Sequence, residues 1–188
     1  MTHEKSWPLR PCQTHHSIRP SQCDLASLHT ASTLVLNCID FRLRDEVTRF
    51  LNHNLHLQDD YDEMALPGAS LAFVTEAKPH WTQTVDDVIG IAQKLHHVKR
   101  IVFIDHMGCG AYRALLGESM IHADKEKEAH IHTLHKARKK AEQAFPGLEV
   151  STWLMSLNGE IVEYVPNSPQ SVNHHGAIHT TTDDKPHD

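Results

Sequence analysis

The sequence has little of what marks membrane, secreted or nucleic-acid-binding proteins. No run approaches the roughly 18 apolar residues of a membrane helix, and the first residues lack the apolar core of a signal peptide. Four cysteines among 188 residues are too few and too far apart for a disulfide framework. Lys and Arg (18) are outnumbered by Asp and Glu (24), which does not favour nucleic acid as a partner. We therefore expect a cytoplasmic protein that binds neither membrane nor nucleic acid.

Histidine, in contrast, is abundant, with 18 residues in the chain. The net charge of −6 counts these side chains as neutral, so it changes sign if they all become protonated. Several of the histidines, such as His130 and His132, fall on or beside predicted helices and are expected on solvated polar faces. Their number alone assigns no function, so the spacing of particular residues has to be considered.

Composition divides the chain into three parts. Residues 1–30 are rich in Pro, Ser, Gln and His and predict an N-terminal arm, either flexible or wrapped around a partner subunit. Residues 167–188 predict a loose, His-rich tail. The segment 31–166 between them is long enough to bury its own core and is the expected folded domain.

Within 31–166, short apolar runs alternate with amphipathic segments. The apolar runs predict strands over 33–39, 61–66, 99–105 and 148–157, and 160–165 can pair beside the last of these after a turn. Helical spacing of apolar residues predicts helices over 43–55, 82–97, 108–116 and 124–145. This alternation predicts an α/β fold, with an open, mainly parallel central sheet of four or five strands flanked by helices.

Chemically reactive side chains follow two of the predicted strands. The segment Cys-Ile-Asp-Phe-Arg occupies 38–42 after the first strand, and His-Met-Gly-Cys-Gly occupies 106–110 after the third. The carboxyl ends of parallel strands meet at one edge of the sheet, which is where such folds bind ligands. Two thiols, an imidazole and a carboxylate would then converge, and these are the ligands of a tetrahedral zinc site.

The spacing fits three protein ligands. His106 and Cys109 lie three residues apart across a strand-to-helix turn, so both can face one point, and a helix N-terminus there favours the Cys109 thiolate. Cys38 supplies the third bond. The fourth position stays open for water or hydroxide, as in catalytic zinc sites. Asp40 can occupy that position or hydrogen-bond to the bound water, and Arg42 can hold it by a charge-assisted pair; Asp40 also fits a helix N-terminal cap.

The two segments, in this order and on these strand ends, resemble the zinc-site signature of the β-class carbonic anhydrases. The resemblance covers 31–166 in element order and implies a β-carbonic anhydrase-like fold. It implies Zn²⁺ held by Cys38, His106 and Cys109, an Asp40–Arg42 pair beside the metal, and a homodimer or higher homo-oligomer. The implied activity is that of a carbonate dehydratase, a lyase in which zinc-bound hydroxide hydrates CO₂ reversibly to bicarbonate and a proton.

The sequence departs from that family in two places. Many members carry an Arg-Asn pair after the second strand, where this chain has Met-Ala-Leu-Pro-Gly-Ala-Ser at 64–70. Gly68 and Ala69 could offer backbone N–H groups to a bound substrate there. Asp105 stands where a small Gly is common, and it either orients a zinc ligand or caps the following turn.

Two other functions remain open. The same site could hydrolyse a CO₂ analogue, carbonyl sulfide or carbon disulfide, because its nucleophile would attack any small linear molecule of this type. Alternatively, Asp40 closes the fourth position and the domain is a zinc-binding module without turnover. An open apolar pocket at 66–70 would favour an enzyme, and a filled segment would favour the module.

Overall fold

The computed structural model describes residues 27–165, so almost all of the predicted arm and tail lies outside the described residues. None of the helices formed by this part of the chain has the length and apolar character needed to span a bilayer. The description below concerns the α/β domain.

A five-stranded sheet with the order β2-β1-β3-β4-β5 forms the centre of the domain. Four strands are parallel and the fifth, at one edge, is antiparallel. The strands are β1 (Thr33–Asn37), β2 (Tyr61–Ala65), β3 (Arg100–His106), β4 (Glu149–Met155) and β5 (Ile161–Glu163). The predicted α/β fold with a mainly parallel sheet is thus confirmed, including the short strand that follows the turn at Asn158 and Gly159.

Five α-helices connect the strands. They are α1 (Arg44–Arg49), α2 (Ser70–Val74), α3 (Pro79–His96), α4 (Gly110–Leu116) and α5 (Ala123–Ala144). Short helical turns add η2 (Phe41–Leu43), the π-helical η3 (Phe50–Asn54) that prolongs α1, and η4 (Glu118–Ile121). The sequence did not indicate α2, because this five-residue helix is almost wholly buried and so has no polar face to reveal its period.

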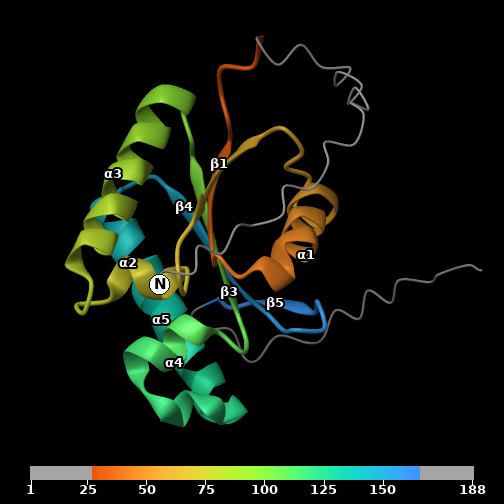
Figure 1. Cartoon of the computed structure of the whole chain (residues 1–188). Coiled ribbons are helices and arrows are strands. Elements are labelled where there is room, and N and C mark those ends of the chain that lie inside the picture. Colours follow the sequence, from red (N-terminus) through yellow and green to blue (C-terminus); the bar gives the residue numbers. More distant parts are fainter. Residues whose placement is uncertain (1–26, 166–188) are drawn as a thin grey trace, which may run out of the picture.

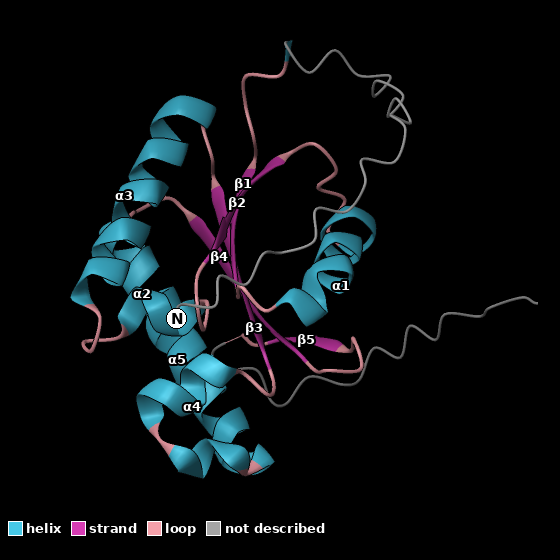
Figure 2. Ribbon diagram, in the orientation of Figure 1, coloured by secondary structure: helices cyan, strands magenta, loops and turns pink. Residues whose placement is uncertain are grey.

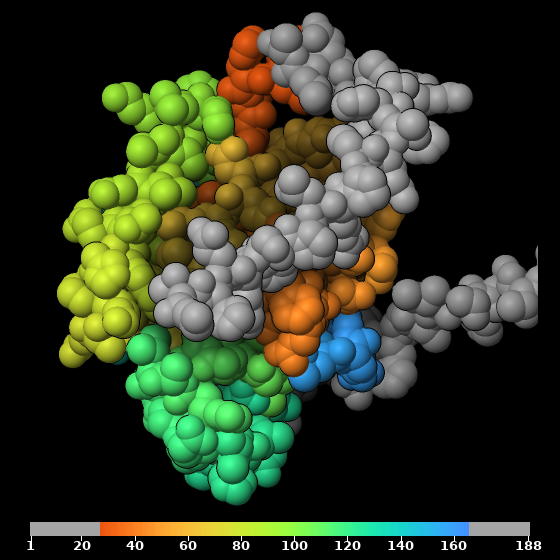
Figure 3. Space-filling view, in the orientation of Figure 1, coloured from red at the N-terminus to blue at the C-terminus, as the bar shows by residue number. Residues whose placement is uncertain are grey.

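The helices cover both faces of the sheet. Figures 1 and 2 show α2, α3 and α5 on one side and α1 on the other. Side chains alternate between these layers along each strand: Leu34 and Leu36 of β1 pack into the cluster that includes helices α3 and α5, whereas Val35 packs with Val47 of α1. Figure 3 shows the surface of α1 beside that of β5, consistent with Glu46 packing near Gly159 in the turn before β5.

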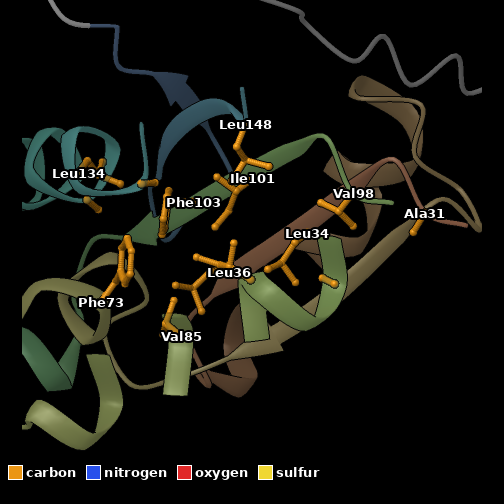
Figure 4. Packing of buried hydrophobic residues seen from close by; sticks show 14 of the residues in the cluster. Ala31, Leu34, Leu36, Phe73, Val85, Val98, Ile101, Phe103, Leu134 and Leu148 are labelled. Atoms are coloured by element: carbon orange, nitrogen blue, oxygen red, sulfur yellow. The ribbon is translucent and has the colours of Figure 1, made fainter. Parts of the chain in front are cut away.

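The larger core cluster has an aromatic pair at its centre. Phe73 of α2 stacks on Phe103 of β3 with ring centroids 5.6 Å apart, and both side chains are fully buried. Figure 4 shows these rings facing each other, with Leu134 nearby. The short helix α2 is therefore held against the sheet by apolar packing.

Replacing Phe103 with alanine should remove this contact and leave a cavity. We expect Phe103→Ala to lower the free energy of unfolding by about 3–5 kcal/mol, measured by urea denaturation. Leu95→Ala is the control, because Leu95 is 58% exposed and its loss should change stability by no more than about 0.5 kcal/mol. Equal losses in the two variants would contradict the assigned core.

Candidate metal centre

The pairing of β1 with β3 brings three metal-ligating side chains together. Asn37, the last residue of β1, pairs with Ile104 of β3, so the segments that leave the two strands are neighbours. Cys38 follows β1 directly, His106 ends β3, and Cys109 lies in the turn before α4. Within residues 27–165, these three form the group whose ligand atoms all lie within 4.8 Å of one another.

The geometry of the donors suits a tetrahedral metal ion. The Cys38 and Cys109 Sγ atoms are 3.9 Å apart, close to the roughly 3.8 Å between two thiolates that each bind zinc at about 2.3 Å. His106 Nδ1 pairs with the Met107 carbonyl oxygen at 2.9 Å, and its Nε2 is buried with no hydrogen-bond partner. A hydrogen bond from Nδ1–H leaves Nε2 as the metal-binding nitrogen. The residues present therefore fit a zinc ion.

The charges of the three groups are interdependent. The pKa of Cys38 is lowered to about 4, because its sulfur accepts a hydrogen bond from the Cys109 thiol; burial opposes this shift, and His106 adds to it. The pKa of Cys109 is raised by its hydrogen bond to Cys38 and by burial. Burial alone would lower the pKa of His106, but the neighbouring Cys38 thiolate raises it. Two thiolates at this separation repel each other, so a divalent cation between them is needed to hold both charges.

Asp40 and Arg42 form an ion pair beside this group. Arg42 Nε donates to Asp40 Oδ1 at 2.9 Å and Nη2 donates to Oδ2 at 2.6 Å, while Nη2 also donates to the Gly108 carbonyl at 3.1 Å. The guanidinium lowers the pKa of Asp40 to about 2. Asp40 Oδ2 lies 3.8 Å from His106 Nε2, close enough to reach a metal ion or a water bound to it. Asp40 also caps η2 by accepting the Arg42 backbone N–H.

Gly68 and Ala69 lie next to the metal ligands, but their N–H groups already have partners. Gly68 N–H is donated to Cys38 Sγ at 3.4 Å, and Ala69 N–H to the Leu66 carbonyl at 3.0 Å. The structure thus gives Gly68 a contact with a ligand sulfur that the sequence did not indicate. A role for the two residues in substrate binding stays a prediction.

A narrow cavity adjoins the site on the α1 side. Residues of the site and apolar side chains line it together. The lining consists of Asn37, Cys38, Asp40, Leu43, Arg44, Val47, Ile104, His106 and Met155. The segment 66–70 is filled: residues 68–70 are buried, and a Cβ on Gly68 would lie only 3.2 Å from Leu71 Cβ. Of the two outcomes considered for this segment, the filled one favours the module, whereas the cavity on the α1 side, which the sequence did not indicate, gives the site adjoining space elsewhere.

The structure adds a buried polar cluster that sequence reasoning missed. Asp105 accepts hydrogen bonds from Ser70, Tyr112 and His130, and none of these four side chains is more than 1% exposed. The placement of His130 on a solvated face is therefore wrong. The Asp105 side chain bonds to Ser70, Tyr112 and His130, so it does not cap the following turn, and an orienting role toward a metal ligand stays a prediction. The only sequence signal was that His130 shares the helical stripe of Leu134, Ala137 and Ala141.

Comparisons with known proteins agree with this geometry. A family model described as "Putative carbonic anhydrase" matches residues 28–164. An uncharacterized protein of Rickettsia bellii (strain RML369-C) is 45% identical over 153 residues, covering 81% of this chain and 93% of the relative. An uncharacterized protein of Rickettsia conorii (strain ATCC VR-613 / Malish 7) is 44% identical over 146 residues, covering 77% of each chain.

Solved structures resemble the chain more distantly. A carbonic anhydrase of Streptococcus mutans has a TM-score of 0.49 at 17% identity, covering 72% of this chain and 83% of its own. The apo form of a carbon disulfide hydrolase has a TM-score of 0.48 at 13% identity, covering 78% and 86%.

Removing the imidazole should abolish tight metal binding, because two thiolates alone leave the site incomplete. We expect His106→Ala to retain little zinc after dialysis against a chelator, which removes metal held weakly by the many other histidines. His96→Ala is the matched control, since His96 is exposed and pairs with Asp62 away from this site. Elemental analysis of the dialysed proteins measures the difference. Full zinc content in His106→Ala would exclude the three-ligand site.

Proposed function

The chain belongs to the carbonic anhydrase-like family whose model spans residues 28–164, and on that premise we propose that it is a zinc enzyme that hydrates CO₂ reversibly to bicarbonate and a proton. The observation that supports this most is the position of the Asp40–Arg42 pair, whose carboxylate lies 3.8 Å from His106 Nε2. A purely structural zinc site has four protein ligands, and Asp40 is the candidate for the fourth. Arg42 engages both oxygens of that carboxylate, which favours Asp40 as a neighbour of the open position over Asp40 as a ligand.

Cys38, His106 and Cys109 are the proposed zinc ligands. Zinc, when bound there, lowers the pKa of a coordinated water toward neutrality and so supplies a nucleophile. Two thiolates donate more electron density to the metal than imidazoles do, so we expect that water to ionise at a higher pH than in a site built of histidines. The activity should therefore increase toward alkaline pH.

Asp40 is the proposed group that orients the nucleophile. Its pKa of about 2 keeps the carboxylate ionised at physiological pH, so it accepts a hydrogen bond and does not donate one. Arg42 holds both carboxylate oxygens and is itself bonded to the Gly108 carbonyl in the loop of Cys109. The carboxylate is thus fixed in relation to two of the metal ligands. Fixed geometry of this kind is what a hydrogen-bond acceptor that orients a reacting water needs.

The cavity beside the site supports a small, linear, apolar substrate. Leu43, Val47 and Met155 line one part of it, while Asp40 and His106 line the other. CO₂ fits this description, and so do carbonyl sulfide and carbon disulfide. Hydrolysis of one of these analogues is therefore the alternative activity, and the same assay can decide between them.

We further propose that the chain assembles as a homo-oligomer in the cytoplasm. Large apolar side chains are exposed near the site: Phe41 is 84% exposed, Ile39 57% and Leu157 51%. Apolar groups of this size next to a functional site are typical of a surface covered by another subunit. A reducing compartment would keep Cys38 and Cys109 as the thiols that a metal requires.

Stopped-flow CO₂ hydration by zinc-loaded protein is the direct test of the activity. We expect hydration well above the buffer rate, increasing from about pH 6 to pH 9 as the zinc-bound water ionises. Carbonyl sulfide and carbon disulfide are assayed in parallel. Absence of CO₂ hydration by protein that contains one equivalent of zinc would exclude the proposal, and turnover of an analogue alone would establish the alternative.

Asp40→Asn separates metal binding from turnover. An amide is nearly isosteric with the carboxylate but is neutral and has only one acceptor oxygen, so it makes a weaker hydrogen bond to the nucleophile. We therefore expect zinc content to persist while kcat/KM falls by roughly 10²–10⁴-fold. Asp45→Asn, an exposed substitution of the same kind in the first turn of α1, should keep full activity. Full activity in Asp40→Asn would remove Asp40 from the reaction.

A further inference from the structure

We infer that Asp105 and Glu126, two buried acids outside the metal-binding set, are positioning residues that fix the two cysteine ligands through backbone hydrogen bonds. The inference rests on the metal site of the proposed function but does not depend on which substrate is turned over. It is based on the contacts of the two carboxylates, the backbone conformation at Ala69 and the position of His130 between them.

Asp105 lies next to His106 in β3 but faces the opposite side of the sheet. His106 lines the cavity on the α1 side, whereas Asp105 points toward α2 and α5. Its carboxylate is 1% exposed. It accepts four hydrogen bonds, from Ser70 N at 2.9 Å, Ser70 Oγ at 2.7 Å, Tyr112 Oη at 2.6 Å and His130 Nδ1 at 3.0 Å. Two of these four bonds hold the same residue, Ser70.

Ser70 ends a turn whose backbone is strained. Ala69, directly before it, has φ +45° and ψ −104°, a conformation that costs free energy for any residue with a side chain. The surrounding structure has to enforce such a conformation, and Asp105 does so by holding both the N–H and the hydroxyl of Ser70. On the other side of Ala69, Gly68 directs its N–H at Cys38 Sγ. Asp105 thereby fixes the donor that contacts the first cysteine.

Glu126 acts on the second cysteine. It lies in the first turn of α5, is 6% exposed, and its Oε1 accepts the Cys109 backbone N–H at 2.9 Å. This bond ties the ligand-bearing loop to a helix of 22 residues. His130, one turn further along α5, lies between the two acids: its Nδ1 is 3.0 Å from Asp105 Oδ2 and its Nε2 is 3.7 Å from Glu126 Oε1. One face of α5 thus carries Glu126, which binds the Cys109 backbone, and His130, which contacts Asp105.

Stability alone does not account for this cluster. Burying two carboxylates is unfavourable, and apolar side chains of similar volume would pack a core at lower cost. The bonds of these acids nevertheless converge on the loops that carry Cys38 and Cys109. Hydrogen bonds of this kind around a metal site orient the ligands and tune how strongly they donate to the metal. A positioning role explains why both acids lie where they do.

Isosteric substitutions test the inference by metal affinity, with no need for turnover. We expect Asp105→Asn and Glu126→Gln each to weaken Zn²⁺ affinity by about 10–100-fold, measured by competition with a chromophoric chelator. In the Co²⁺-loaded proteins, the thiolate-to-cobalt charge-transfer band should shift, because the thiolates change orientation. Thr152→Val is the control. This fully buried threonine lies in β4, away from the site, and donates a hydrogen bond to the carbonyl of Tyr164, the residue after β5. It should lose stability but keep Zn²⁺ affinity within about threefold.

Two outcomes would overturn the inference: both variants retaining the parent's affinity and cobalt spectrum, or Thr152→Val losing as much affinity as they do. If Asp105→Asn does not fold, Ser70→Ala tests the same arm, because it removes only the hydroxyl that Asp105 binds. Weaker Zn²⁺ binding in the variants of a parent that binds zinc but lacks CO₂ hydration would support the positioning role while excluding the proposed enzymatic function.

Discussion

The parallel pairing of β1 with β3 is the constraint on which the site depends. Cys38 and Cys109 are 71 residues apart in the chain, so no local turn could bring their sulfurs to 3.9 Å. The register that sets Asn37 opposite Ile104 makes both strands end at the same edge, where Cys38 directly follows β1, His106 ends β3 and Cys109 lies in the turn after it. A shift of one residue in this register would move His106 relative to Cys38 and turn alternate side chains to the wrong face. The core that fixes the register therefore also fixes the metal donors.

Asp105 and His106 are adjacent in β3 and lie on opposite faces of the sheet, and their polar atoms differ in whether they have hydrogen-bond partners. His106 and Asp105 are 2% and 1% exposed, and both are polar. The Asp105 carboxylate accepts hydrogen bonds from four donor atoms of three residues, as expected of a buried carboxylate with a supporting role. His106 Nε2 has no partner, which is unfavourable for a buried nitrogen. His130 Nε2 also has no hydrogen-bond partner, but it lies 3.7 Å from Glu126 Oε1, whereas His106 offers its nitrogen beside the two cysteine sulfurs, where metal binding would offset the cost.

The sequence predicted those parts of the molecule that local pattern encodes. An almost continuous apolar run marked β1 and an apolar centre marked β3, and the strand-end segments at 38–42 and 106–110 led to the three donors that the fold brings together. The helix α2 escaped notice, since a short helix buried on every side has no amphipathic period. His130 was expected in solvent because polar residues on a helix normally face it, and the sequence did not single out Glu126. Their burial depends on partners 17 and 25 residues away, which only the tertiary structure supplies.

The balance of charge explains why the supports must be rigid. Cys38, Cys109 and Asp40 all converge on one point, while the guanidinium of Arg42 is engaged with Asp40 and is 43% exposed. Without a cation, Cys109 keeps its proton and hydrogen-bonds to the Cys38 sulfur. Once both thiols are ionised, as a metal requires, their repulsion would move loosely held loops apart. The Gly68 and Glu126 bonds oppose that movement at each cysteine, and Arg42 opposes it by joining Asp40 to the Gly108 carbonyl. With its loops held in this way, the site would need less of an ion's binding free energy for ordering the ligands.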